Sequence, residues 1–386
     1  MQAVILAAGE GRRLGPLTEG RPKPMIPVGN RPILESVLEA AIEAGADEIV
    51  LVVGHARERI QSHFGDGDRW NVPIHYVTQK HRLGAAHALS LVESHVEGEF
   101  LALHGDQLVE AALLERLLDR WESTGIPTIA AVQSERPTEY GAVEVDGEAV
   151  RSVSRVPTDD PPFLVNGGAY VLDDRVFDVI RKIPESEDSD FGMATALQRL
   201  SDQGTLSAVL HRGAWQDLTY PWDVLSTNAT LLGQRETPAE HDGVHQTAAV
   251  SDDVAIDTGA TVGPNATVLP GTALGHNVHI GANAVLSNCI VMDGGRVGNG
   301  AVLHDCFVGE AAAIGPNVAV EGGPAQVVVD DTVHRNVDLG GVVADRATLR
   351  GNVTVTPGAI VGREVLADSG TVLQGRIDSG ETVRRG

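Results

Sequence analysis

The chain has 386 residues, and its 53 acidic side chains against 29 basic ones give a formal net charge of -24. This length exceeds that of one ordinary domain, and 42% hydrophobic residues are enough to bury a sizeable core, which argues against a disordered chain. The acid excess and the lack of a long basic run exclude a nucleic-acid partner. No apolar run reaches the length of a membrane span, and residues 1–9 lack the pattern of a signal peptide, so we expect a cytoplasmic protein with no membrane partner.

Lysine is scarce, with Lys23, Lys80 and Lys182 beside 26 arginines. Abundant carboxylates with few lysines are typical of a halophilic protein, because molar salt reduces the Debye length to roughly 3 Å and screens self-repulsion. A genomic base composition that exchanges Lys for Arg is the alternative. Cys289 and Cys306 lack the spacing of metal ligands, so we interpret both as buried reduced thiols.

Residues 1–233 alternate between short apolar runs and amphipathic segments. The clearest amphipathic segment, residues 32–44, predicts a helix with Pro32 in its first turn. This alternation predicts an α/β domain with a doubly wound, Rossmann-like parallel sheet, whose ligands lie at the carboxyl ends of the strands. After Tyr140 the pattern becomes that of a β-hairpin with its turn at residues 146–147. The runs predicted to form buried strands are residues 3–8, 48–53, 74–78, 100–104 and 128–132.

The composition changes near residue 243, since Phe307 is the one aromatic residue after it. We therefore expect a linker at residues 234–243 and a second domain at residues 244–386. Apolar residues recur there at every sixth position, which indicates a parallel left-handed β-helix of hexapeptide repeats, in which every sixth side chain points inward. The residues that carry the period are Val244, Val250, Ile256, Val262, Val268, Leu274, Ile280 and Leu286, then Val308, Ile314 and Val320, then Val337, Val343, Leu349, Val355 and Val361.

The hexapeptide period breaks at residues 293–295 and 321–331. Both breaks predict loops that leave the β-helix, and such insertions tend to mark a binding face. Cys289 and Cys306 each follow a leucine of the repeat by three residues, so we expect them to stack in adjacent coils.

A glycine-rich segment follows the first predicted strand. Gly9 and Gly11 allow backbone N–H groups to approach a phosphate closely, because no β-carbon intrudes. The spacing differs from the dinucleotide fingerprint, and the prolines that follow exclude an immediate long helix. Residues 10–31 carry five cations against two acids, a local net charge of +3 in a chain of -24. This island of positive charge favours a polyphosphate ligand.

Residues 6–24 resemble the signature L-x-x-G-x-G-T-R-[LM]-x-P-L-T, followed by P-K-P, of the sugar-1-phosphate nucleotidylyltransferases. The match departs at Arg12, where the family usually has Thr. The resemblance implies that Arg13 and Lys23 are catalytic residues that bind and polarise phosphates. Residues 79–89 resemble the family's base-reading loop, although Ala85 replaces the usual Thr. The nucleotide-binding residues implied by the resemblance are Leu6, Ala7, Ala8, Gly9, Gly11, Gln79, Gly84 and Ala85.

Two aspartates stand at positions where the same family binds metal. Asp106 ends the run H-G-D after a predicted strand, and Asp217 lies in W-x-D-x-x-x-P-W-D, another family match. The resemblance implies that both hold Mg²⁺, which neutralises phosphate charge when a sugar phosphate attacks a nucleoside triphosphate. A turn or cap is the alternative for an aspartate at the end of a strand.

The sugar pocket matches the family in part. Tyr140 and Gly141 match its Y-G, and Asn166 matches the N-x-G that contacts sugar hydroxyls. Where the family has Glu-Lys-Pro, whose Lys neutralises the sugar phosphate, this chain has Arg155, Val156 and a proline. Arg155 is assigned to the sugar pocket, but adjacent strand residues face opposite sides, so it is not a simple replacement. A changed substrate geometry, a reduced rate and a non-catalytic subunit remain as alternatives.

Residues 302–323 resemble the acetyltransferase segment of bifunctional N-acetylglucosamine-1-phosphate uridylyltransferases of the archaeal type. His304 aligns with the catalytic base that deprotonates a sugar amine before attack on acetyl-CoA, a role that suits imidazole. Phe307 and Glu310 replace the family's Tyr and Asp, so a histidine on the coil surface is the alternative. Family members use this β-helix to trimerise, which implies a homo-oligomer.

The sequence thus predicts a Mg²⁺-dependent enzyme that joins UTP or dTTP to a hexose- or hexosamine-1-phosphate and releases pyrophosphate. One alternative is a regulatory subunit that binds a sugar nucleotide without turnover. The other is a bifunctional enzyme that also transfers an acetyl group from acetyl-CoA on the β-helix.

Overall fold

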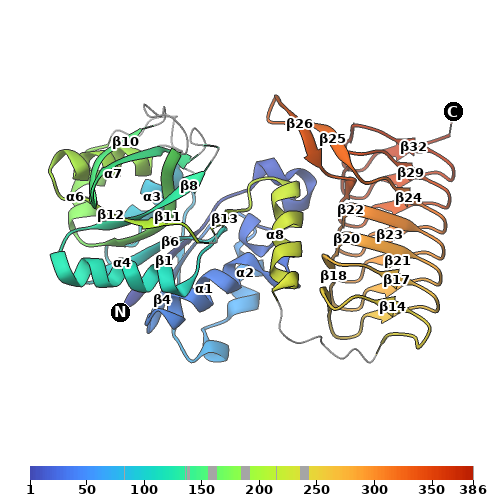
Figure 1. The fold of residues 1–386 in the computed structure, drawn as a ribbon, viewed down its shortest axis with the longest axis horizontal. Coiled ribbons are helices and arrows are strands. Elements are labelled where there is room, and N and C mark those ends of the chain that lie inside the picture. Colours follow the sequence, from blue (N-terminus) through green and yellow to red (C-terminus); the bar gives the residue numbers. More distant parts are fainter. Residues whose placement is uncertain are drawn as a thin grey trace. The chain divides into compact units, whose positions relative to one another are not determined.

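The computed structural model describes residues 1–81, 83–134, 136, 140–154, 163–183, 192–213, 215–234 and 243–385. They form two compact units, whose elements are labelled in Figure 1. The α/β unit consists of Met1–Glu10, Pro22–Met25 and Ile33–Asp217, and the solenoid unit of Gly11–Arg21, Ile26–Pro32 and Leu218–Gly386. Segments of the chain before Ile33 therefore belong to both units.

A nine-stranded mixed sheet runs through the described part of the α/β unit, in the order β5-β4-β1-β6-β11-β8-β12-β10-β9. The five strands predicted from the sequence are confirmed as β1, β4, β5, β6 and β8, and the predicted hairpin is β9–β10. The bounds are β1 (Gln2–Ala7), β4 (Glu48–Val53), β5 (Ile74–Thr78), β6 (Phe100–His104), β8 (Thr128–Ser134), β9 (Ala142–Asp146), β10 (Ala149–Ser154), β11 (Phe163–Leu172) and β12 (Ser207–His211).

Strand β11 interrupts the expected parallel order. It pairs antiparallel with both β6 and β8, so β6 and β8 run in the same direction but are not neighbours. Its sequence contains Asn166 followed by two glycines, residue types that favour a turn, so it was not predicted as a strand. The register shifts between Asn166 and Tyr170, and Gly168 has a φ of +68°. This bulge redirects the strand at the position of Asn166.

Helices cover the sheet of the α/β unit and complete its core. The predicted helix is confirmed as α1, but Pro32 lies in β3 just before it rather than in its first turn. The helix ends at Glu43, and just beyond it the N–H of Gly45 donates to the carbonyl of Ile42. The bounds are α1 (Ile33–Glu43), α2 (Arg57–Phe64), α3 (Gly84–Ser90), α4 (Ala111–Thr124), α6 (Arg175–Ile180) and α7 (Gly192–Asp202), with the 3-10 turns η2 (Lys23–Met25) and η3 (Asp68–Trp70).

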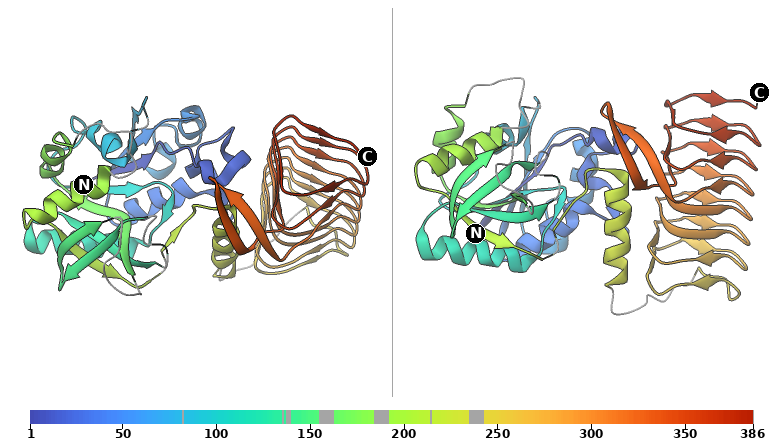
Figure 2. Two further views of the ribbon diagram at one scale, coloured as in Figure 1. Left: turned by 90° about the horizontal axis from the view of Figure 1, so that it is seen from above. Right: turned by 45° about the horizontal axis from the view of Figure 1, so that its top comes forward.

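The solenoid unit is a stack of parallel coils, seen from two further sides in Figure 2 and consistent with the left-handed β-helix predicted from the hexapeptide period. One face contains β14 (Ala249–Val250), β17 (Thr267–Val268), β20 (Val285–Val291), β22 (Val302–Val308), β24 (Ala319–Val320), β29 (Thr354–Val355) and β32 (Val372–Leu373). A second contains β16 (Thr261–Val262), β19 (His279–Ile280), β21 (Arg296–Val297), β23 (Ala313–Ile314), β28 (Thr348–Leu349), β31 (Leu366–Ala367) and β34 (Thr382–Val383). A third row of strands contains β15 (Val254–Ile256), β18 (Thr272–Leu274), β27 (Gly341–Val343), β30 (Ala359–Val361) and β33 (Arg376–Ile377). In this row β18 pairs with the end of the long strand β20, and β27 with the end of β22.

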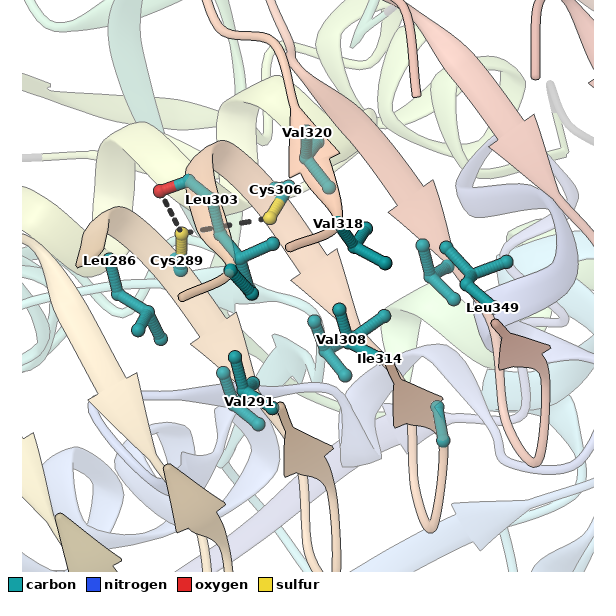
Figure 3. Packing of buried hydrophobic residues seen from close by; sticks show 14 of the residues in the cluster. Leu286, Cys289, Val291, Leu303, Cys306, Val308, Ile314, Val318, Val320 and Leu349 are labelled. Carbon is teal, nitrogen blue, oxygen red and sulfur yellow. Dashed lines mark hydrogen bonds between the residues drawn. The ribbon is translucent and has the colours of Figure 1, made fainter. Parts of the chain in front are cut away.

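The interior of the coils is a column of aliphatic side chains (Figure 3). Val262, Ile280, Val297, Ile314 and Leu349 follow one another in paired strands and are each at most 3% exposed. Because each coil places its inward residue over that of its neighbour, stacking supplies the core that no single coil can form.

Two details of the predicted repeat are corrected. The break at residues 293–295 is a tight turn within the stack, in which Gly295 donates to the carbonyl of Met292. The second break is a β-hairpin of β25 (Pro324–Val329) and β26 (Thr332–Asp338). Val337 lies in β26 and pairs with Ala325, so it belongs to this hairpin and not to the column of the repeat.

The two cysteines stack as expected. Cys289 and Cys306 occupy paired positions in β20 and β22, and their sulfur atoms are 3.6 Å apart (Figure 3). Both are buried free thiols. The hydrogen bond with Cys289 and burial raise the pKa of Cys306 well above its usual value, which keeps it a protonated, unreactive thiol.

Helix α8 (Pro221–Gly233) packs along the coils within the solenoid unit, against β18 and β20. The side chain of Asn228 accepts a hydrogen bond from the N–H of Gly29 and donates one to the carbonyl of Gly271. It thereby joins the small hairpin of β2 (Pro27–Val28) and β3 (Arg31–Pro32) to the coils. Among the helices that the structure describes, none is long and apolar enough to cross a membrane.

Candidate active site

The candidate site of the α/β unit centres on the side chain of Lys23, which lies between two carboxylates. Its Nζ is 2.6 Å from Oδ2 of Asp106 and donates a hydrogen bond of 3.3 Å to Oδ1 of Asp217. Lys23 begins η2 (Lys23–Met25), Asp106 follows β6, and Asp217 ends β13 (Gln216–Asp217), which pairs with β7 (Gln107–Leu108). The Lys23 and Asp217 side chains are 10% and 7% exposed. The fold thus brings together three candidate residues that are far apart in the sequence.

The charges of this cluster stabilise one another. Burial disfavours the ammonium of Lys23, but the attraction of Asp106 and Asp217 outweighs it and holds the pKa of Lys23 above its usual value. Burial also opposes the charge of Asp106, yet Lys23 nearby lowers the pKa of that carboxyl below its usual value. Burial lowers the pKa of His104, which keeps its imidazole neutral. At neutral pH the cluster therefore holds a lysine ammonium beside an ionised carboxylate.

Asp106 and Asp217 fit the donor set of a Mg²⁺ site. They converge on one cation, the ammonium of Lys23, and carboxylate oxygens are the ligands that Mg²⁺ prefers in proteins. Within the described ranges no group of three or more His, Cys, Asp or Glu side chains is placed to hold a metal. A pair of carboxylates suits Mg²⁺ when substrate phosphates and water complete its shell.

The end of β1 supplies the start of the glycine-rich segment. Leu6 and Ala7 end the strand, and the carbonyl of Leu6 accepts a hydrogen bond of 3.0 Å from the N–H of Gly105, the residue before Asp106. A β-carbon at Gly105 would lie 3.1 Å from that carbonyl oxygen, so the close approach favours glycine, and a larger residue would make the neighbouring chain shift by a few tenths of an ångström. A β-carbon at Gly9 would meet no atom within 4 Å, which leaves room above its backbone for a ligand.

The predicted base-reading residues lie together at the start of α3. Gln79 follows β5, and its Nε2 donates to the carbonyl of Gly84 at 3.1 Å. Gly84 begins α3 with a φ of +82°, and Ala85 follows it in the helix. A cavity of about 330 Å³ adjoins Gln79 and is also lined by Gly54 and Lys80, at the carboxyl ends of β4 and β5. The site therefore lies where the sheet topology predicted a ligand.

The predicted sugar-binding residues meet at the bulge of β11. The N–H of Asn166 donates to the carbonyl of Gly141, and the Asn166 side chain accepts from the N–H of Gly168 at 3.3 Å. The ring of Tyr140 packs edge-on against Trp215, with centroids 5.2 Å apart. Arg155, and with it Val156, lies outside the described residues.

Two side chains that the sequence did not single out support this region. The hydroxyl of Tyr170 accepts a hydrogen bond of 2.8 Å from Nδ2 of Asn166 and lies 3.3 Å from Nε2 of His104. The indole N–H of Trp215 donates to the carbonyl of Gly167 at 3.0 Å. Trp215 opens a family motif and was available from the sequence, whereas Tyr170 lies in an apolar strand where nothing marks its hydroxyl.

The other part of the signature segment belongs to the solenoid unit. Residues Gly11–Arg21 include η1 (Arg12–Thr18), in which Thr18 donates its hydroxyl hydrogen to the carbonyls of Gly11 and Gly15. The guanidinium of Arg13 lies 3.6 Å from a carboxylate oxygen of Asp330 in the turn of the β25–β26 hairpin. It also lies 5.8 Å from the ring centroid of Tyr220. Arg13 is therefore held by acidic and aromatic groups of the solenoid unit.

Arg21 links the segment Gly11–Arg21 to the coils of the solenoid unit by hydrogen bonds. Its guanidinium bonds to Oδ1 of Asp345 at 2.6 Å and to Oε2 of Glu310 at 3.2 Å. The side chains of Arg21 and Asp345 are 5% and 4% exposed, so this is a buried ion pair. The backbone N–H of Glu310 also donates to Asp345, which closes the network. Glu310, which the sequence aligned with an acetyltransferase residue, thus takes part in holding the signature segment.

His304, the third candidate catalytic residue, lies in β22 and pairs with Ser287 of β20. A β-carbon at Gly322 would come within 2.7 Å of the β-carbon of His304, so the chain passes closely over it. Like Arg13, His304 belongs to the solenoid unit.

Comparison with known proteins identifies the family. Residues 2–233 match the family model described as nucleotidyl transferase, and residues 250–374 match the GMPPB C-terminal domain. The first match spans more than half of the chain, so the protein belongs to the nucleotidyl transferase family, a family of enzymes. The resemblance found in the sequence is confirmed.

The relatives differ in how much of this chain they cover. A bifunctional protein GlmU of Methanococcus maripaludis is 28% identical over 98% of this chain and 96% of its own length. A UTP–glucose-1-phosphate uridylyltransferase, AglF, of Haloferax volcanii is 34% identical over 58% of this chain and 93% of its own length. The structure of a putative glucose-1-phosphate thymidylyltransferase from Bacillus anthracis superposes with a TM-score of 0.56 at 20% identity, covering 62% of this chain and 98% of that one. That last likeness concerns the fold.

Proposed function

We propose that the protein catalyses Mg²⁺-dependent transfer of a nucleotidyl group from UTP or dTTP to a sugar-1-phosphate, releasing pyrophosphate. The observation that carries this proposal is the buried Lys23 held between the carboxylates of Asp106 and Asp217. Relatives named as glucose-1-phosphate uridylyltransferase and as bifunctional GlmU favour a hexose- or hexosamine-1-phosphate as the acceptor. Both substrates are metabolites of the cytoplasm, which is where we place the reaction.

The proposed chemistry is an in-line displacement at phosphorus. A phosphate oxygen of the sugar-1-phosphate forms a bond to the α-phosphorus of the triphosphate, and the bond from that phosphorus to the oxygen bridging to the β-phosphate breaks. Asp106 and Asp217 would hold Mg²⁺, which would neutralise phosphate charge when bound. Lys23 and Arg13 bind phosphate oxygens, while Tyr140, Gly141 and Asn166 orient the sugar. No covalent enzyme intermediate is needed.

Pyrophosphate release from a panel of nucleoside triphosphates and sugar phosphates tests this proposal. The wild type in molar KCl with Mg²⁺ is compared with Asp106→Asn and with Asp119→Asn, an exposed aspartate on α4 as matched control. We expect turnover in the wild type and the control and its loss in Asp106→Asn. A requirement for molar KCl would support halophilic adaptation, whereas equal activity in dilute buffer favours genomic base composition. Equal activity of Asp106→Asn would contradict the assigned metal site.

A regulatory subunit is the alternative that Val156 raises. Such a subunit would bind a nucleotide sugar tightly and release no pyrophosphate with any substrate pair. Calorimetric titration with a nucleotide sugar, run beside the turnover assay, separates the two. Tight binding without turnover would replace the proposed enzyme by this alternative.

A second activity, transfer of an acetyl group from acetyl-CoA to glucosamine-1-phosphate, is favoured by one observation. The similarity to bifunctional relatives extends through the β-helix, over 98% of the chain. His304 would accept the proton of the sugar amine, whose nitrogen then attacks the acetyl carbonyl and displaces the CoA thiol. Release of free thiol should occur in the wild type and vanish in His304→Ala. Its absence in the wild type would reject this activity.

We also propose that residues 244–386 mediate assembly into a trimer or a multiple of it, with residues 234–243 as a linker after the domain at 1–233. Molar mass measured by light scattering tests the assembly. A mass near 40.6 kDa, that of one chain, would contradict it.

A further inference from the structure

The side-chain amide of Gln79 has its two hydrogens already committed within the α/β unit. Nε2 lies 3.1 Å from the carbonyl oxygen of Gly84 and 2.9 Å from Nδ1 of His87. A backbone carbonyl can only accept a hydrogen bond, so the amide nitrogen, and not the amide oxygen, must face Gly84. The orientation of the Gln79 amide therefore follows from its partners.

This orientation fixes the state of His87 as well. An amide nitrogen has no acceptor capacity, so Nδ1 of His87 must accept its second hydrogen. Nδ1 then carries no hydrogen, and in the neutral ring the hydrogen sits on Nε2. His87 lies in the middle of α3, and its own carbonyl accepts the hydroxyl hydrogen of Ser90. Helix α3, which begins at Gly84, thus carries both acceptors that hold Gln79.

The oxygen of the amide is left for a ligand. Gln79 is 7% exposed, and it lines the cavity of about 330 Å³. Its backbone N–H is bound to the carbonyl of Val53 at 2.8 Å, which fixes the residue at the end of β5. Because both amide hydrogens are already bonded, Gln79 can offer a ligand only an acceptor, the oxygen Oε1.

We propose that His87 is a positioning residue for base selection, which holds the Gln79 amide so that an acceptor, and not a donor, meets the nucleobase. This inference rests on the proposed function, because it assigns Gln79 to the base of the triphosphate. Uracil, thymine and guanine each offer a ring N–H beside a carbonyl, and this N–H is the donor that Oε1 requires. Cytosine presents an unprotonated ring nitrogen at the same place, so two acceptors would face each other and one would stay unpaired.

Simple packing is the competing role for His87, and the two roles predict different results. A packing residue would affect all triphosphates alike, or only the stability of α3. A positioning residue changes the ratio of affinities for UTP and CTP, because its loss allows the amide to turn and offer Nε2 to cytosine. Gly84 still restrains the amide, so the change should be partial.

Calorimetric titration of the full chain with UTP and with CTP, both with Mg²⁺, tests the proposal without requiring turnover. The variants are His87→Ala, which removes the acceptor, and His87→Asn, whose Oδ1 can replace Nδ1 as acceptor. His95→Ala, a histidine elsewhere in the α/β unit, serves as the control. We expect the wild type and His95→Ala to prefer UTP over CTP. In His87→Ala the ratio of the two affinities should fall about fivefold, and His87→Asn should restore most of it.

An unchanged UTP to CTP ratio in His87→Ala would overturn the proposal, as would a wild type that binds both equally. If His87→Ala loses its fold, measured by circular dichroism, the comparison of His87→Asn with His87→Leu at the same position decides it. Selective binding by the wild type without pyrophosphate release would refute the proposed function while leaving the role of His87 intact.

Discussion

The two units of the molecule bury different kinds of side chain. In the solenoid unit the buried positions are aliphatic and nearly interchangeable, as Ile280, Val297 and Ile314 show by following one another in one column. In the candidate site of the α/β unit a charged side chain is buried with particular partners, as Lys23 is with Asp106 and Asp217. A repeated apolar column tolerates volume-conserving change, whereas a buried charge cluster fails when one member is removed.

The solenoid unit also contains a buried charge pair, Arg21 and Asp345, among its aliphatic residues. Breaking this pair gives the largest expected effect on stability. Asp345→Ala should lower the free energy of unfolding by about 3–5 kcal/mol, because it leaves the buried guanidinium of Arg21 with the half-exposed Glu310 as its remaining carboxylate partner. Urea unfolding in molar KCl measures the loss. Asp331→Ala, at an exposed position of the β25–β26 turn, is the control. Equal midpoints for the two variants would show that the pair does not stabilise the unit.

Lys23→Met should affect chemistry more than folding. Without the ammonium, one cation that neutralises phosphate charge is lost, and kcat/KM should fall by roughly 10²–10³-fold. Lys182→Met, at an exposed lysine just beyond the end of α6, is the control and should retain wild-type turnover. A loss below tenfold would mean that Lys23 only balances the charge of the two aspartates.

Ile280→Val tests the tolerance of the apolar column. Removing one methylene group from a fully buried side chain should lower the free energy of unfolding by about 0.5–1.5 kcal/mol, with nucleotidyl transfer unchanged. Urea unfolding and the pyrophosphate assay, run on one preparation, separate the two effects. A fall in turnover without a fall in stability would contradict the division of roles between the units.

The smallest effect is expected at the Arg13–Asp330 contact. Both side chains are about half exposed, 44% and 58%, so Asp330→Asn should change stability by less than about 1 kcal/mol. It should nevertheless tighten triphosphate binding, because the carboxylate no longer competes for the guanidinium of Arg13. A lower KM for UTP with unchanged kcat is the expected result, and an unchanged KM would mean that Asp330 does not compete with substrate.

Much of the fold was predictable because the sequence contains two regular patterns, the alternation of strands with helices and the hexapeptide repeat. Alternation of strand and helix gave β1, β4, β5, β6 and β8, and the hexapeptide period gave the column of the coils. Strand β11 was missed because its central Asn-Gly-Gly forms a bulge there rather than a turn. Val337 was misplaced because an inserted hairpin continued the spacing by chance.

The residues of the site were predictable only where they lie in a family motif. Lys23, Asp106 and Asp217 follow from the family signature, and the structure brings them together. The role of Asp345 was not predictable, since an aspartate in a repeat coil resembles many others until the partner that the fold gives it, Arg21, is known. His87 likewise becomes informative only through its contact with Gln79.

The most direct test is pyrophosphate release by the wild type and by Asp217→Asn across a Mg²⁺ titration. If Lys23, Asp106 and Asp217 form the reaction centre, the wild type should require Mg²⁺, and Asp217→Asn should be nearly inactive at Mg²⁺ levels that saturate the wild type. Turnover that is independent of Mg²⁺, or a variant that matches the wild type throughout, would contradict it.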